Sequence, residues 1–219
     1  MLSNCRLWLI LLFIFPLRVF CQSNYYEPEP KVFDGGAILG VNFSQVDGDT
    51  YFGYHKVGVQ VGGVVYVHFT KVFGASVELL YSQKGSRGES VKESPAIGTY
   101  VSKYFMNLNY AEIPLTVHAI IHTIDVEVGA SYGLLVSSKE WVQTDQQVLI
   151  DPDKNRFNTS DIDYVFGVGR RVFKKLYANV RYQYSVTSMR PPERIPVGFG
   201  FNNNGQFNNL FNFRLMYYF

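Results

Sequence analysis

Apolar and polar residues alternate along eight stretches of this chain. The stretches cover residues 35–46, 56–69, 73–86, 104–118, 124–139, 161–173, 176–189 and 207–219. A period of two is typical of a β-strand with one apolar and one polar face. Several stretches exceed the ~5–6 residues usual for soluble strands. They also cover the ~9–11 residues that a tilted strand needs to cross a bilayer. The pattern therefore predicts an all-β protein with strands long enough to span a membrane.

The stretch KVGVQVGGVVYVHF, residues 56–69, shows the alternation clearly. Its apolar face carries Val57, Val59, Val61, Val65, Val67 and Phe69. Its other face carries mostly glycine and polar residues, namely Gly58, Gln60, Gly62, Tyr66 and His68. Tyr and Phe gather near the strand ends on the apolar face, where transmembrane barrels place their aromatic girdles.

The connections between the stretches alternate in length. Those after the second, fourth and sixth stretches are short, whereas the three longest are polar loops expected at 88–103, 141–160 and 190–206. This alternation places all short turns at one barrel end and all long loops at the other, as in outer-membrane barrels. We therefore predict an eight-stranded antiparallel up-and-down transmembrane β-barrel. An even strand number puts both termini at the short-turn, periplasmic end.

The chain ends in FNFRLMYYF, an alternating segment that continues to the last residue. An open sheet edge cannot be satisfied in lipid, so this strand is expected to pair with the first strand and close the barrel. The alternation also resembles the C-terminal signal by which barrel-assembly machinery recognises its substrates. Its expected members are Phe213, Leu215, Tyr217 and Phe219.

The first 21 residues differ from the rest. Arg6 precedes an unbroken apolar run from Leu7 to Phe15, which is too short to span a bilayer as a helix and is typical of a signal peptide. We predict a signal peptide at 1–21, a periplasmic leader at 22–33 and a barrel domain at 34–219. A lipoprotein anchor at Cys21 is the alternative, and the bulky Phe20 before it argues against one.

Removing this segment changes the composition. Both cysteines lie within it, so the remaining chain has none and cannot form a disulfide. Without Arg6 and Arg18 the 20 basic residues fall to 18, equal to the 18 acidic ones. A neutral chain gives no reason to expect a nucleic-acid partner. The charged fraction of 17% is below the ~25% of soluble domains, and aromatic residues reach 16%.

An eight-stranded barrel is just wide enough for side chains to fill its interior. By strand parity we expect Glu78, Glu127, Arg181 and Arg214 to point inward, together with Lys84 and Glu112. Opposite charges across a narrow lumen pair with one another, so we interpret these six as a structural charge network. The alternative to a structural role is acid–base catalysis by Glu78 with Glu112. Catalysis needs a cleft that a substrate can enter, and a filled barrel lacks one. A change of parity before Pro114 suggests a β-bulge at 111–114.

Other candidate chemistry is weak. His118 and His122 share a strand face but lie about 13 Å apart, which disfavours a metal site. A Ser/His hydrolase on the lipid face would need a histidine beside a serine in mid-strand, and we find none on that face. We expect no catalytic, metal-binding or cofactor-binding residues. The three long loops are the candidate surfaces for an envelope protein partner, and outer-membrane lipid surrounds the strands.

Four segments resemble a known family. They are GVNFSQVDGD (40–49), VELLYSQKGSR (77–87), MNLNYAEIPL (106–115) and ASYGLLVSSKE (130–140). Together they are similar to the PorT-like outer-membrane β-barrel proteins of Bacteroidota, and the likeness extends over nearly the whole chain after residue 21. The resemblance implies an eight-stranded barrel in the outer membrane and a link to protein secretion through the type IX pathway. It implies no catalytic residues.

We therefore expect a non-enzymatic outer-membrane barrel that serves as a structural, binding or assembly component of the cell envelope. The alternative is a soluble exported barrel that binds a small apolar ligand, as lipocalins do. In that case the apolar face would point inward and the charges outward, so the placement of charges distinguishes the two.

Overall fold

The structure is a computed structural model that describes residues 32–94, 98–144, 147–196, 198–200 and 205–219. The predicted signal peptide and nearly all of the predicted leader lie outside these residues. The strands are β1 (Phe33–Asp47), β2 (Lys56–His68), β3 (Phe73–Ser94), β4 (Gly98–Ile121), β5 (Ile124–Gln143), β6 (Gln147–Leu149), β7 (Ser160–Arg171), β8 (Leu176–Ser185) and β9 (Phe207–Tyr218). A 3₁₀-helix, η1 (Pro192–Arg194), lies between β8 and β9.

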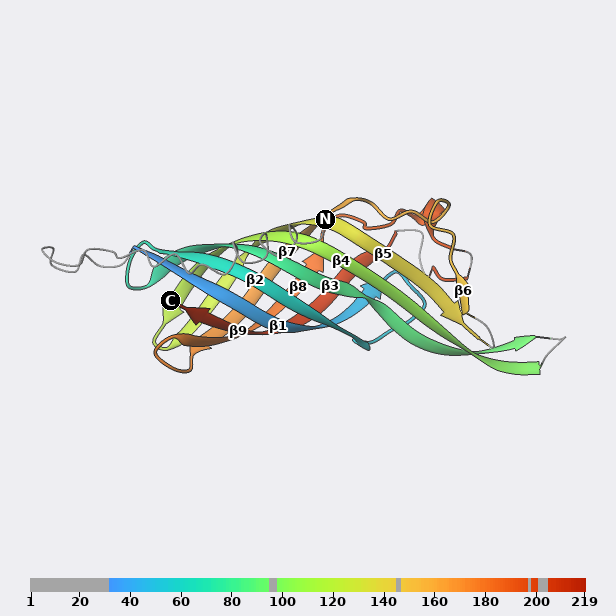
Figure 1. Cartoon of the computed structure of the whole chain (residues 1–219), viewed down its shortest axis with the longest axis horizontal. Helices are drawn as coiled ribbons and strands as arrows, with labels where there is room; N and C mark the ends of the chain where they lie inside the picture. Colours follow the sequence, from blue (N-terminus) through green and yellow to red (C-terminus); the bar gives the residue numbers. More distant parts are fainter. Residues whose placement is uncertain (1–31, 95–97, 145–146, 197, 201–204) are drawn as a thin grey trace, which may run out of the picture. The chain divides into compact units, whose positions relative to one another are not determined.

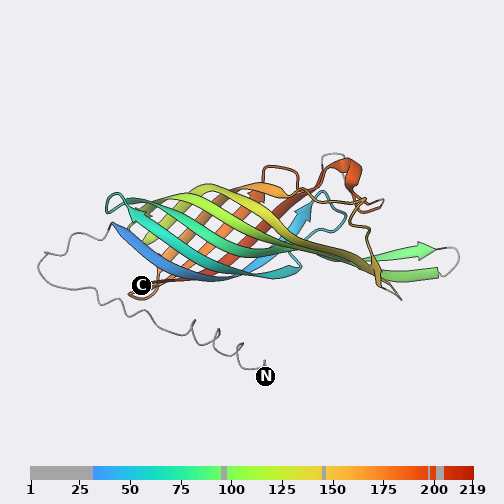
Figure 2. The same ribbon diagram turned by 45° about the horizontal axis from the view of Figure 1, so that its top comes forward.

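The long strands form one closed antiparallel ring (Figures 1 and 2). The hydrogen-bonded order is β4-β3-β2-β1-β9-β8-β7-β5, and β4 pairs with β5 to close it. Within the described residues β6 is the one strand outside the ring, because its three residues pair only with β5. With β6 set aside, each long strand pairs with the long strands before and after it in the chain, and β9 pairs with β1. The predicted eight-stranded up-and-down barrel is therefore confirmed.

The last strand closes the ring as its alternation predicted. β9 pairs with β1 from Gly36↔Tyr218 to Asp47↔Phe207, and it pairs with β8 on its other side. The Phe219 N–H continues the ladder by donating to the Gly35 carbonyl at 3.0 Å. The start of β1 and the end of β9 thus lie at one barrel end, together with the three short turns 69–72, 122–123 and 172–175.

The structure corrects the expected loop at 88–103. Strands β3 and β4 continue through this segment and pair as far as Ser94↔Gly98, forming a two-stranded ribbon that extends beyond the ring (Figure 2). Val91 faces Val101 across the ribbon, and Lys103 forms an ion pair with Glu89 at 3.0 Å. The ribbon is polar because it lies outside the apolar belt. A polar segment of this kind is easily taken for a loop when only the sequence is known.

The predicted bulge at 111–114 is also wrong. β4 keeps a single parity throughout, so Leu108 and Tyr110 are inward-facing apolar residues and Pro114 lies on the same face. The irregularity lies in the partner strand instead. Asn109 pairs with Ser137 and Tyr110 with Leu135, so Val136 of β5 is the extra residue. Beyond this bulge Glu140 points inward.

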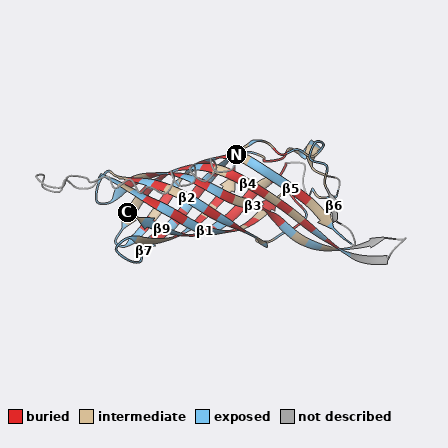
Figure 3. Ribbon diagram, viewed as in Figure 1, coloured by how far each residue is buried: buried red, intermediate tan, exposed pale blue. Residues whose placement is uncertain are grey.

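Buried and exposed residues alternate along the strands (Figure 3), and the two sets differ sharply in chemistry. The exposed outer positions are apolar and include Leu39, Val59, Val77, Leu115, Val128, Phe166, Val180 and Phe213. The buried inner positions include charged and amide side chains from all eight long strands, alongside two apolar clusters. A water-soluble barrel with an apolar interior would have the reverse arrangement. The charges are inside, as expected for a barrel surrounded by lipid.

Aromatic rings gather on the outer surface at the loop end. They include Tyr54, Tyr164, Tyr182, Tyr184 and Phe211, whose neighbouring ring centroids lie 5.1–6.1 Å apart. Aromatic girdles mark the boundary between lipid and water in transmembrane barrels. In the described parts of the chain, no helix is long and apolar enough to cross a membrane.

Candidate functional site

The part of the lumen nearer the short-turn end is filled by two glutamates and two arginines, which we call the Glu/Arg layer. Arg181 donates from Nη1 and Nη2 to the two carboxylate oxygens of Glu78 at 3.0 and 2.8 Å, and from Nε to Glu127 at 2.7 Å. Arg214 donates to Glu78 at 2.8 Å and to Glu127 at 3.2 Å. Asn179 accepts two further bonds from Arg214. The layer is neutral, and all four charged side chains are buried.

A second layer lies above it, toward the loop end, and we call it the Lys84 layer. The Lys84 ammonium forms ion pairs with Glu112 and, at 2.7 Å, with Asp163. It also lies 5.2 Å from the centroid of the Tyr110 ring. A third carboxylate, Asp161, accepts bonds from Ser185 at 2.7 Å and from Asn208 at 2.8 Å. Hydroxyl and amide donors therefore support the carboxylates that Lys84 alone would leave uncompensated.

All six residues of the predicted charge network lie inside the barrel, but in two layers. Glu78, Glu127, Arg181 and Arg214 form the first, and Lys84 and Glu112 belong to the second. Sequence reasoning missed Asp161, Asp163 and Gln183. The parity of SDIDY, where the two aspartates alternate with Ile162 and Tyr164, was the signal that could have found two of them.

Glycines make room for these side chains. A Cβ on Gly167 would lie 2.2 Å from the Glu127 carboxylate, and one on Gly169 would lie 2.4 Å from the Tyr177 ring. The GVG sequence of β7 thus lets two large lumenal side chains lie flat against the barrel wall. It is no nucleotide-binding loop, because a strand continues on both sides.

The loop end of the lumen is closed by a further group of side chains, which we call the outer cap. Arg190 donates from Nη1 to Glu140 at 3.0 Å and stacks 3.7 Å from the Phe157 ring centroid. Tyr104 also donates to Glu140 and stacks on Tyr51 with centroids 5.0 Å apart. The cap draws on β4, β5 and the connections after β1, β6 and β8.

Asp49 lies in the connection after β1, beside the outer cap. Its backbone forms a bridge with Gly200, so it joins the first and last outer connections. Burial raises the pKa of its carboxyl from 3.8 to about 7, an effect that the hydrogen bonds from Ser86 and the Tyr51 N–H oppose and that the nearby Asp47 and Glu140 reinforce. A proton on Asp49 therefore favours closure of these connections.

At the short-turn end, His118 joins three strands. Its Nδ1 lies 3.0 Å from Asp125, and its Nε2 lies 2.9 Å from the hydroxyl of Ser76 and 3.0 Å from that of Thr116. This Ser/His pair lies in the lumen and not on the lipid face. Ser76 is 2% exposed, so a substrate carbonyl has no path to its oxygen. The arrangement fixes the imidazole between a carboxylate and two hydroxyls.

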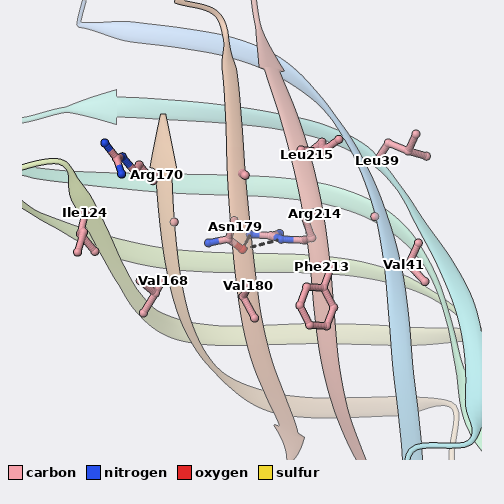
Figure 4. Close-up of a pocket in the computed structure, with 13 residues that line it drawn as sticks. Leu39, Val41, Ile124, Val168, Arg170, Asn179, Val180, Phe213, Arg214 and Leu215 are labelled. Atoms are coloured by element: carbon pink, nitrogen blue, oxygen red, sulfur yellow. Dashed lines mark hydrogen bonds between the residues drawn. The ribbon is translucent and has the colours of Figure 1, made fainter. Parts of the chain in front are cut away.

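Two cavities lie outside this packed interior at the short-turn end. One, of about 290 Å³, opens at the mouth and is lined by residues that include Tyr66, His68, Asp125, Arg171 and Tyr177. The other is an apolar groove of about 580 Å³ on the outer surface, across β1, β9, β8 and β7 (Figure 4). In the described part of the chain no three His, Cys, Asp or Glu side chains come together as metal ligands.

These features define a small transmembrane β-barrel with a filled lumen. The sequence profile of the outer membrane protein β-barrel domain family matches residues 22–190, so the chain belongs to that family and is an outer-membrane protein. No relative is found among the curated proteins.

Several solved structures are similar to this barrel. Ail, the attachment invasion locus protein of Yersinia pestis, has a TM-score of 0.48 at 12% identity and covers 85% of this chain and 98% of its own. Neisserial surface protein A has a TM-score of 0.46 at 9% identity and covers 85% and 97%.

Proposed function

We propose that this protein is a non-enzymatic component of the outer membrane that acts through its cell-surface ribbon and loops, with both termini in the periplasm. The observation that carries the proposal is the filled lumen. The Glu/Arg layer, the Lys84 layer and the outer cap occupy successive levels of the barrel, and their charged groups bond to one another. Such an interior supports a role in contact rather than in transport or catalysis.

The ribbon is the best candidate contact surface. Pairing of β2 with β3 stops at Gln60↔Ser82, and pairing of β4 with β5 stops at Lys103↔Gln143. The segments 90–94 and 98–102 therefore pair only with each other. Val91 and Val101 are 69% and 50% exposed on one face of the ribbon. The ribbon thus offers this apolar pair together with strand edges that pair with no other described strand, and an exposed strand edge can bind a segment of another protein.

The finer parts of the proposal have separate support. The periplasmic position of the termini is supported by the short turns at that end, as in barrels of known orientation. Recognition by the barrel-assembly machinery is supported by the outward row Phe213, Leu215 and Tyr217, with Phe219 following it. A role in type IX-like secretion is supported only by the resemblance to PorT-like proteins of Bacteroidota.

Cysteine labelling of intact cells tests the orientation. The chain has no cysteine after residue 21, so a single new one reports its own position. Val91→Cys lies on the ribbon and Thr123→Cys lies in the turn between β4 and β5; both side chains are exposed. A membrane-impermeant maleimide should label Val91→Cys in intact cells and Thr123→Cys only after permeabilisation. The opposite pattern would contradict the proposed orientation.

A ribbon deletion tests the contact role. Replacing residues 90–102 by a two-residue Asn-Gly turn keeps the Glu89↔Lys103 pair and every pairing with β2 and β5, so the shortened barrel should still fold and insert. We expect it to fail to complement the envelope or secretion defect of a strain that lacks the protein. Full complementation by the folded, surface-exposed variant would refute a contact role for the ribbon.

A further inference from the structure

The apolar groove on the outer surface is built from two rows of side chains that cross four strands. In each row, every residue is the register partner of the next one on the neighbouring strand. The first row consists of Leu39, Leu215, Ala178 and Arg170, and the second consists of Val41, Phe213, Val180 and Val168. Ile124 of β5 follows Arg170 at the end of the first row. Figure 4 labels all of these residues except Ala178, and their side chains lie along the groove.

The groove exists because of Ala178. Its methyl group is the smallest side chain in the first row, between Leu215 on β9 and Arg170 on β7. The hollow of about 580 Å³ is within the ~300–1,000 Å³ of small-molecule pockets. Its walls are almost wholly aliphatic and aromatic. An extended hydrocarbon chain fits this chemistry.

Cations gather beside the groove. Arg170 lies within the first row and opens the sequence RRVFKK. Arg171 lines the neighbouring mouth cavity, and Lys174 and Lys175 follow in the turn to β8. The Lys175 ammonium lies 5.8 Å from the centroid of the outward Tyr217 ring. Val172 and Phe173, at the tip of the turn, are exposed. Cations around an apolar turn are typical of an element at the level of lipid headgroups.

No side-chain ion pair to these cations is formed within the described residues. Asp34 and Asp125, which line the mouth cavity together with Arg170 and Arg171, are bonded to other partners. Asp34 accepts from His68 at 2.8 Å, while Asp125 bonds His118 at 3.0 Å and Tyr177 at 2.8 Å. The turn therefore places four basic residues, none of them in a side-chain ion pair among the described residues, next to an apolar groove.

We propose that the groove and the RRVFKK turn bind an anionic diacyl phospholipid, with one acyl chain over Ala178 and the phosphate at Arg170 and Lys175. Inside a bilayer the acyl chain gives little selectivity, because lipid tails are as apolar as leucine. Selectivity comes from the headgroup, where each basic residue near an anionic surface contributes about fivefold. The inference rests on the proposed orientation only for its leaflet, which would be the periplasmic one.

Native mass spectrometry of the purified barrel tests the site. The probes are dioleoyl phosphatidylglycerol and dioleoyl phosphatidylcholine, which share their chains and differ in net charge. We expect the anionic lipid to be retained at least tenfold better. The double variant Arg170→Gln/Lys175→Gln should reduce this preference about 25-fold or abolish it. Equal retention of both lipids by the unchanged protein would overturn the proposal.

A matched control is available at the other barrel end. Arg87 and Lys139 are also exposed and also lie over aromatic rings, 5.0 Å from Phe105 and 5.4 Å from Trp141. Arg87→Gln/Lys139→Gln makes the same charge change and should leave the preference intact. An equal loss in this control would show a general charge effect and refute the site.

A third variant tests the groove itself. Ala178→Leu fills the hollow without a change of charge, so both lipids should bind less well while their ratio is retained. Glycerophosphate, which carries the charge without the chains, should not displace the bound lipid. Displacement would mean a phosphate site alone. All arms use purified protein, so they succeed or fail independently of the labelling that tests the orientation.

Discussion

Arg181→Met should destabilise this barrel more than any surface substitution, because it removes the central cation of the Glu/Arg layer. Three hydrogen bonds are lost, two to Glu78 and one to Glu127. Methionine is apolar and of similar length, so the lumen stays filled. The layer changes from two cations and two carboxylates to one cation and two carboxylates.

The magnitude follows from the burial of what remains. Glu78 and Glu127 are 2% and 1% exposed and would share Arg214 as their one arginine partner. Breaking a buried ion pair by removing one partner costs about 3–5 kcal/mol. Adding Glu127→Gln removes the excess negative charge, because Arg214 and Glu78 then balance. This second change should restore part of the loss, with a coupling of about 0.5–3 kcal/mol.

Urea titration of the refolded barrel in detergent measures the loss, with the folded fraction read from the unboiled band on a gel. Arg170→Met is the matched control. It removes an arginine from the outer surface, where no ion pair is formed among the described residues, so its effect should stay within about 0.5 kcal/mol. The reasoning fails if Arg181→Met costs less than about 1 kcal/mol. It also fails if Glu127→Gln worsens the variant instead of rescuing it.

Three further predictions concern single features. The pKa of Asp49 is raised from 3.8 in the unfolded chain to about 7 in the folded protein, so the folded state holds the proton more tightly. The free energy that keeps the connection 48–55 folded onto the barrel should therefore fall by up to about 4 kcal/mol as the pH rises from 4 to above 7. Hydrogen exchange corrected for intrinsic rates should show this loss in the unchanged protein and not in Asp49→Asn. Gly167→Ala should cost about 1–3 kcal/mol in the same urea titration, because its Cβ meets the Glu127 carboxylate; no loss would mean that Glu127 moves aside freely. Deleting Phe219 together with Tyr217→Ala should lower the yield of membrane-inserted barrel in cells but not refolding in detergent, and equal yields in cells would argue against an assembly signal.

The barrel itself was predictable from the sequence. Strand alternation places lipid-facing residues such as Val59 and Val128 on one face, and the turn lengths fix the up-and-down order. These features are local, so one sequence suffices. Closure of the ring by the last strand, FNFRLMYYF, was predictable because the backbone groups of an open sheet edge find no hydrogen-bond partners in lipid.

The ribbon and the bulge were not predictable in the same way. In the ribbon both faces meet water, so Glu89 and Ser90 carry no period-two signal that separates a strand from a loop. The bulge keeps the apolar Val136 on the outer face, so the sequence pattern does not change there. The change of face becomes visible only later, where Glu140 points inward. In both places the pairing with the neighbouring strand, and not the local pattern of residues, decides the structure.

The site was partly predictable. Parity identified the inward charges, but it gives no register, and register decides which of them meet. Lys84 meets Asp163, 79 residues away, and His118 meets Ser76, 42 residues away. Those contacts depend on the shear of the closed ring.

The central claim is a closed barrel in the outer membrane, and fractionation followed by a gel tests it most directly. Cells that express the full chain are separated into soluble and membrane fractions, and each is run with and without boiling. The account predicts a species in the outer-membrane fraction that migrates faster when unboiled. A soluble protein with no heat-dependent shift would contradict it.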